Sequence, residues 1–225
     1  SNLGRVRIER PTIEIALRAD GSNLEDLMAS LGGDATADEE PSTESSELPP
    51  ALHLEVVDGT ILLHDEVGAR RWRIGQWGLT LDASDLATTP MRAKTSALVE
   101  GEALPGRMQA EMTVPWGVVS GTPSSAPAEI TLQTENLPAA IGDAIARRFA
   151  PGTQASGLVT VAVQTSYAPA SDKTAARTSV RGRVVADQLE LATPALGGDR
   201  LQLARLEMPC QLDLNGDELK VDQLA

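Results

Sequence analysis

Residues 6–31 read VRIERPTIEIALRADGSNLEDLMASL and decide the fold class. Over 7–17 apolar residues alternate with polar ones, which is the period of a strand with one apolar face. The extended pattern breaks at Asp20-Gly21, and Ser22 with Glu25 has the spacing of a capping box. The segment therefore predicts a strand, a turn and a short helix.

The sequence downstream continues with short period-two segments. Val159, Val161 and Val163 fall on one side of one such segment, and Leu189 and Leu191 share a side of a later one. One stretch differs: ENLPAAIGDAIARRF carries a single apolar stripe and predicts a helix near 137–149. We therefore expect a mainly antiparallel β fold with one or two short helices.

Two dipeptides predict β-hairpins. Asn215-Gly216 is expected to close a hairpin from Leu212 to Leu219, and Asp58-Gly59 to close another within 52–64. A two-residue turn fixes the register of the second hairpin and gives it one aliphatic face, made by Leu52, Leu54, Val56, Ile61 and Leu63.

The segment RRWRIGQWGLTLDASDLATTP, residues 70–90, follows this predicted hairpin. It is expected to form two short strands around a turn loosened by glycine.

The predicted hairpin register also pairs the two histidines of the chain. His53 faces His64, with Glu55 diagonal to His64. A transition-metal site usually has three or four ligands held by further hydrogen bonds. Because two imidazoles and one carboxylate fall short of this, we favour a solvated cross-strand pair and expect neither a metal site nor a cofactor.

The charge of the chain is −13, and it is unevenly distributed. No Lys or Arg lies between Arg18 and Arg70, and residues 32–50 are rich in Asp, Glu, Ser, Thr and Pro with one large apolar residue. This segment predicts a disordered acidic loop. We interpret it as a solvated linker, and the alternative is an acidic tail that binds a basic partner.

Composition also excludes some classes of function. Net negative charge and only five aromatic residues argue against nucleic-acid binding, which needs clustered cations and stacking platforms. We expect no enzyme, because there is no phosphate loop or nucleophile elbow, although pairs of acids remain open. No run of about 18 uncharged apolar residues predicts a transmembrane helix.

The quoted segments together resemble a known family, the AsmA-like proteins of Gram-negative envelopes. The resemblance rests on the pattern I..P.I.I....DGSNL..L near the start. It extends through LHLEVVDGTILLHD (52–65), LPAAIGDAIARRFAPGTQASGLVTVAVQ (137–164) and residues 182–225, so it covers most of the chain.

The resemblance implies a long curled antiparallel sheet, a β-groove, whose apolar inner surface conducts phospholipid between the inner and outer membranes. It implies a periplasmic protein whose parent is anchored in the inner membrane by segments outside this chain. The residues expected to contact acyl chains are Leu52, Leu54, Val56, Ile61, Leu63, Val159, Val161, Val163, Leu189 and Leu191. The alternative is a structural or protein-interaction β module of the cell envelope.

The chain divides accordingly into three parts. We expect an N-terminal strand and short helix (1–31), the acidic loop (32–50) and an antiparallel meander (51–225). Because strand patterns continue to both termini, the sequence is interpreted as a piece truncated at both ends from a longer protein.

Overall fold

The structure is a computed structural model that describes residues 2–31, 51–83, 89–100, 105–115, 118, 126–147, 150–170, 174–215 and 218–224. The predicted acidic loop, 32–50, therefore lies outside the described residues. The elements are β1 (Asn2–Glu9), β2 (Thr12–Leu17), α1 (Asn23–Leu31), β3 (Ala51–Asp65), β4 (Arg70–Ala83), β5 (Met91–Val99), β6 (Gly106–Val114), β7 (Ala128–Pro138), α3 (Ala139–Ala146), β8 (Gln154–Ala168), β9 (Arg177–Ala192), the 3₁₀ turn η1 (Pro194–Leu196), β10 (Arg200–Asn215) and β11 (Glu218–Leu224).

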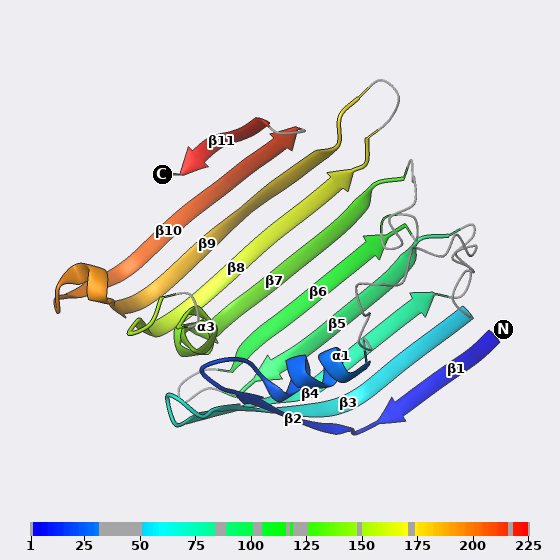
Figure 1. The fold of residues 1–225 in the computed structure, drawn as a ribbon, viewed down its shortest axis with the longest axis horizontal. Coiled ribbons are helices and arrows are strands. Elements are labelled where there is room, and N and C mark those ends of the chain that lie inside the picture. The colour runs from blue at the N-terminus through cyan, green and yellow to red at the C-terminus, as the bar shows by residue number, and fades with distance from the viewer. Residues whose placement is uncertain are drawn as a thin grey trace, which may run out of the picture.

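All eleven strands belong to one open sheet (Figure 1). Their order follows the sequence from β3 to β11, while β1 and β2 both pair with β3. Neighbours from β3 onward are antiparallel, whereas β1 and β2 run parallel to β3 because the chain crosses back before β3 begins. The predicted mainly β fold, a curled and largely antiparallel sheet with short helices, is confirmed.

The hairpin predicted at Asp58-Gly59 is wrong. Residues 51–65 form the single strand β3, and the dipeptide lies at a β-bulge where Asp58 has a φ of 55°. A tight hairpin turn and a bulge both need a residue at positive φ, so Asp-Gly suits either. Gly59 packs under the indole of Trp77, since a Cβ there would come within 2.7 Å of the ring.

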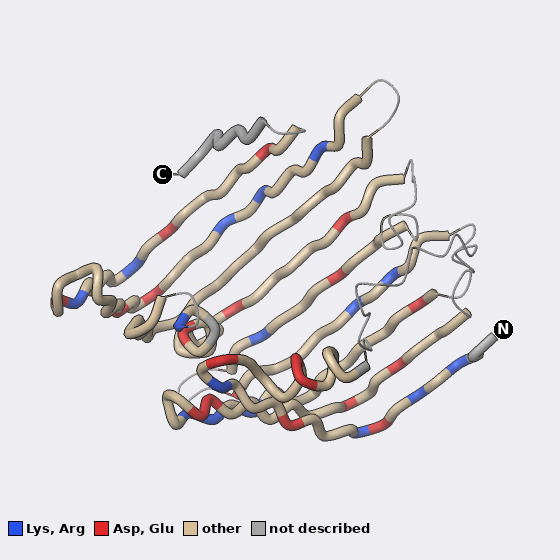
Figure 2. Tube along the Cα trace, in the orientation of Figure 1, with Lys and Arg blue, Asp and Glu red and all other residues tan. Residues whose placement is uncertain are grey.

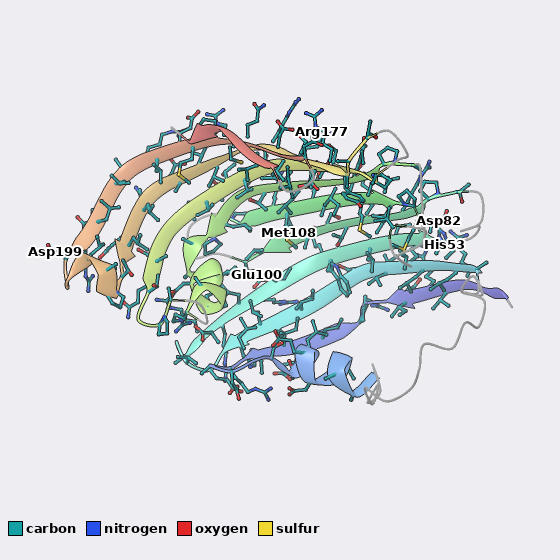
Figure 3. All side chains as sticks on the ribbon, turned by 45° about the horizontal axis from the view of Figure 1, so that its top comes forward. His53, Asp82, Glu100, Met108, Arg177 and Asp199 are labelled. Carbon is teal, nitrogen blue, oxygen red and sulfur yellow. The ribbon has the colours of Figure 1, made fainter. Side chains whose placement is uncertain are left out.

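The two strands predicted within 70–90 are also one strand, β4, with a second bulge at Gln76, where φ is 49°. Further bulges lie in β7 at Asn136 and in β9 at Gln188, both at a φ of 52°. Bulges increase the local twist and bend of a strand. Figure 3 shows the outcome, in which the strands are bent into an arch.

The other predicted hairpin is confirmed. Leu214 pairs with Leu219 and Asn215 with Glu218, so β10 and β11 are antiparallel neighbours. The two residues that join them, 216–217, lie outside the described residues.

Helix α3 begins two residues later than the predicted helix of 137–149, whose residues 148–149 lie outside the described part of the chain. Leu137 and Pro138 are the last residues of β7, because Asn136 sits at the bulge and does not cap the helix. The described helix covers Ala139–Ala146.

Helix α1 begins where the capping box predicts. The Ser22 hydroxyl accepts a hydrogen bond from the Glu25 N–H at 3.2 Å and contacts the Glu25 carboxylate at 3.0 Å. Asn23 ties the helix to β2, because its amide bonds the N–H of Ala16 and the carbonyl of Glu14. Figure 1 shows α1 and α3 in front of the sheet.

Candidate functional site

The register of the strands identifies the residues that share a face of the sheet. Side chains alternate between the faces, and residues paired across strands lie on the same one. Met108 on β6 pairs with Ala97 on β5 and with Thr134 on β7. Figure 3 shows Met108 on the inner side of the arch and Arg177 on the outer side. We call the face of Met108 the inner face and that of Arg177 the outer face.

The inner face is apolar across the sheet. Among the described side chains of β1 to β10, it carries charge only at one end, at Asp65 and Arg70. Away from this end, the side chains that the central strands present are mostly apolar or small and polar, among them Ala93, Thr95, Ala97, Val99, Met108, Ala110, Met112, Ile130, Leu132, Thr134, Val161, Val163, Val180 and Val184.

All ten predicted site residues lie on this inner face. The bulge in β3 makes this possible, because it shifts the alternation by one residue between Val56 and Ile61. Leu54 pairs with Leu81, and Ile61 with Ile74. The predicted aliphatic face therefore exists, although one bulged strand forms it in place of a hairpin. The ten predicted site residues are Leu52, Leu54, Val56, Ile61 and Leu63 on β3, Val159, Val161 and Val163 on β8, and Leu189 and Leu191 on β9.

The described residues place no second layer over much of the inner face. Ile130 on the central strand β7 is 43% exposed, and Leu201 on β10 is 41% exposed. Val6, Ile8 and Met208 on the inner face are similarly open to solvent. In a β-sandwich such positions would pack against a facing sheet. The face is therefore an open apolar trough.

Three polar side chains within the trough, those of Trp77, Thr95 and Thr134, have hydrogen-bond partners in the protein. The Trp77 indole N–H donates to the Thr95 hydroxyl at 3.1 Å, and that hydroxyl donates to the Gly78 carbonyl at 2.9 Å. The buried Thr134 hydroxyl accepts the N–H of Val161 at 2.9 Å. Because these groups are already satisfied, the trough suits a hydrocarbon ligand better than a polar one.

Four charged residues form a cluster at one rim of the trough. Arg147, just after α3, pairs with Asp65 at the end of β3, and Arg70 at the start of β4 lies 3.3 Å from Asp143 on α3. Both carboxylates are 2% exposed, whereas the Arg70 side chain is 41% exposed. We call these four residues the rim cluster.

The rim cluster contains one carboxyl with a shifted pKa. Burial of Asp65 works to raise its pKa, but the Gly68 N–H, at 2.9 Å, and the Arg147 guanidinium outweigh burial and hold the pKa below its usual value. Asp65 therefore remains ionised in the folded protein at neutral pH.

The outer face has the opposite composition. Figure 2 shows charged residues along most strands, and the cross-strand pairs place them on this face. Lys94 lies 2.6 Å from Glu111 on the next strand, and Arg177 lies 3.1 Å from Asp213. The Arg177 guanidinium lowers the pKa of Asp213.

The predicted histidine pair does not form. His53 and His64 lie on the same strand, β3, where eleven residues span about 35 Å. His53 pairs with Asp82 on β4, and the His64 imidazole lies 3.5 Å from the Glu14 carboxylate. The pair was a consequence of the wrong hairpin.

Sequence reasoning missed the rim cluster. Asp65 and Arg147 are 82 residues apart in the sequence, and no local pattern links them. The sequence gives only the position of each member. An Asp at a strand end and an Arg at a helix C-terminus are both common, so neither position identifies the partner.

The comparisons with known proteins found no matching protein-family model, no matching curated protein and no matching solved structure. Among the described residues, no helix has the length and apolar character required to span a membrane.

Proposed function

We propose that the inner face binds the acyl chains of phospholipids and passes them along the trough, as a segment of a longer AsmA-like envelope protein. The observation that carries this proposal is an open apolar face, whose described strand side chains carry no charge away from the rim cluster. On this face Ile130, on a central strand, is 43% exposed. Contiguous apolar surface of this kind marks a binding site.

Acyl chains match the trough chemically. Each methylene removed from water contributes about 0.8 kcal/mol, and the aliphatic side chains impose no directional contacts. Strands such as β3 and β8, with 15 residues each, span about 50 Å, which exceeds the length of one acyl chain. Headgroups would stay in water along the open side. Such transfer needs no catalytic group and no cofactor.

The proposed setting is the periplasm, with the parent protein anchored in the inner membrane and delivering phospholipid toward the outer membrane. This part rests on the sequence resemblance.

A structural or protein-interaction module is the second candidate function. It is favoured by the edges of the sheet, because among the described residues β1 and β2 on one side and β11 on the other have a neighbouring strand on one side only and could pair with another strand.

Photo-crosslinking in cells separates the two candidates. A photoreactive residue replaces Val161, on the inner face, or its neighbour Ala162, on the outer face, in the full-length parent. Lipid adducts at 161 and not at 162 are expected for a conduit. Protein adducts alone at 161 would contradict lipid binding and favour an interaction module.

A further inference from the structure

Helix α3 connects two parts of the sheet that are not neighbours. It follows β7 and packs on β8, yet its ion pairs reach the end of β3 and the start of β4. In the order of the sheet, β5 and β6 lie between β4 and β7. The helix therefore bridges the ends of two intervening strands.

The bridge lies on the inner face. Asp65 follows Leu63 along β3 on that face, and it is the residue that Arg147 contacts. Figure 3 shows α3 beneath the arch, at one end of the strands. The helix thus occupies one rim of the trough, where it links the β3–β4 side of the sheet to the β7–β8 side.

Ion pairs tie α3 to the β3–β4 side of the sheet. Of its described side chains only Asp143 and Ala144 are buried, and Gly142 is exposed. The Asp65–Arg147 and Asp143–Arg70 pairs link this end of α3 to β3 and β4.

One of these attachments is incomplete. The Oδ1 atom of Asp143 is buried without a hydrogen-bond partner among the described residues, and its distance from the Arg147 Nε is 3.9 Å. Buried polar atoms are normally satisfied. The Asp143 carboxylate would regain full solvation if α3 moved into water, so the burial cost of this oxygen opposes the position that α3 occupies.

We propose that α3 is a releasable brace, which the rim cluster holds across one rim of the trough and whose movement admits acyl chains there. The proposal rests on the lipid-binding function proposed above. It identifies Arg147 and Arg70 as positioning residues, which act through α3 and make no contact with the lipid.

The test combines a distance and a rate. Spin labels are placed at two exposed positions, Gly142→Cys on α3 and Arg71→Cys on β4, in a Cys210→Ser background. Their separation is measured by pulsed electron paramagnetic resonance. The uptake rate of a fluorescent phospholipid from phosphatidylcholine vesicles is measured on the same chains without labels.

Arg147→Met is the releasing variant, and Arg147→Lys restores the charge. Arg73→Met is the matched control, because Arg73 also lies on β4 and also forms an ion pair, 3.5 Å from Glu100, but has no link to α3. Release is expected to lengthen and broaden the distance and to accelerate uptake severalfold. The Lys variant and the control are expected to resemble the wild type.

Each outcome decides one point. An unchanged distance in Arg147→Met, with lipid uptake intact in the wild type, overturns the brace and leaves the proposed function standing. A longer distance without faster uptake also overturns it, because α3 would then be structural only. No uptake by any chain, wild type included, overturns the lipid-binding function itself.

A folding defect is controlled separately. Circular dichroism verifies that Arg147→Met retains the β signal of the wild type. If it does not, Arg70→Gln serves as the releasing variant, because Arg70 is partly exposed and its loss disturbs the fold less.

Discussion

The two faces of the sheet share one backbone but handle charge in opposite ways. The outer face spreads exposed ions over neighbouring strands, as in Lys94 and Glu111, whose side chains are 68% and 62% exposed. The inner face confines charge to the rim, where Asp65 is 2% exposed against Arg147. The comparison teaches that a single sheet can carry its exposed charge on one face while the other remains apolar and open.

Removing one ion partner on each face is the strongest way to break this comparison. Asp65→Ala leaves Arg147 without its partner in a partly buried site, so we expect a loss of about 3 kcal/mol in the free energy of unfolding. Lys94→Ala, on the outer face, is expected to cost less than about 1 kcal/mol. Urea unfolding at neutral pH measures both. Equal losses would contradict the distinction between the two kinds of ion pair.

The same new charge at adjacent positions gives a smaller difference. Leu132→Glu puts a carboxylate on the inner face between Ala110 and Val163, and we expect a loss of about 1–3 kcal/mol in stability. Gln133→Glu puts it on the exposed outer face, where the change stays within about 0.5 kcal/mol. Urea unfolding and binding of a fluorescent fatty acid are the measurements. If Leu132→Glu bound fatty acid as the wild type does, the inner face would not be the lipid site.

Acid pH tests the rim cluster with a still smaller effect. The folded pKa of Asp65 lies below the ordinary value of 3.8, so its ionised form stabilises the fold above that value. This contribution is lost as pH falls below 3.8 toward the folded pKa. Unfolding free energies measured from about pH 7 down to about pH 2.5 would show the loss. In Asp65→Asn this part of the pH dependence is expected to disappear, whereas Gln133→Asn retains it.

Alternation of apolar residues predicted the strands and even the inner face of β3 correctly. Period-two patterns depend only on which side of a strand meets water, and this is a local property. The prediction that Leu52, Leu54, Val56, Ile61 and Leu63 share one face was therefore right, although the hairpin was wrong. A bulge preserves the shared face, because it shifts the alternation by one residue.

The two X-Gly dipeptides show where local reasoning ends. Asn215-Gly216 falls at the end of β10, where the predicted hairpin to β11 forms, whereas Asp58-Gly59 forms a bulge within β3. At the bulge Asp58 has a φ of 55°, and Trp77 on β4 packs over Gly59. Contacts of this kind, like the pairing of Asp65 with Arg147, depend on the order of strands in the sheet. No short stretch of sequence predicts them.

The open inner face also has a calorimetric consequence. The heat capacity change of unfolding grows with the apolar area newly exposed to water, at about 12–15 cal/mol/K per residue in ordinary globular proteins. Here residues such as Ile130 and Leu201 meet water before unfolding begins. The chain free of ligand should therefore have a smaller value per residue and a flatter dependence of stability on temperature. A bound hydrocarbon would restore the usual curvature.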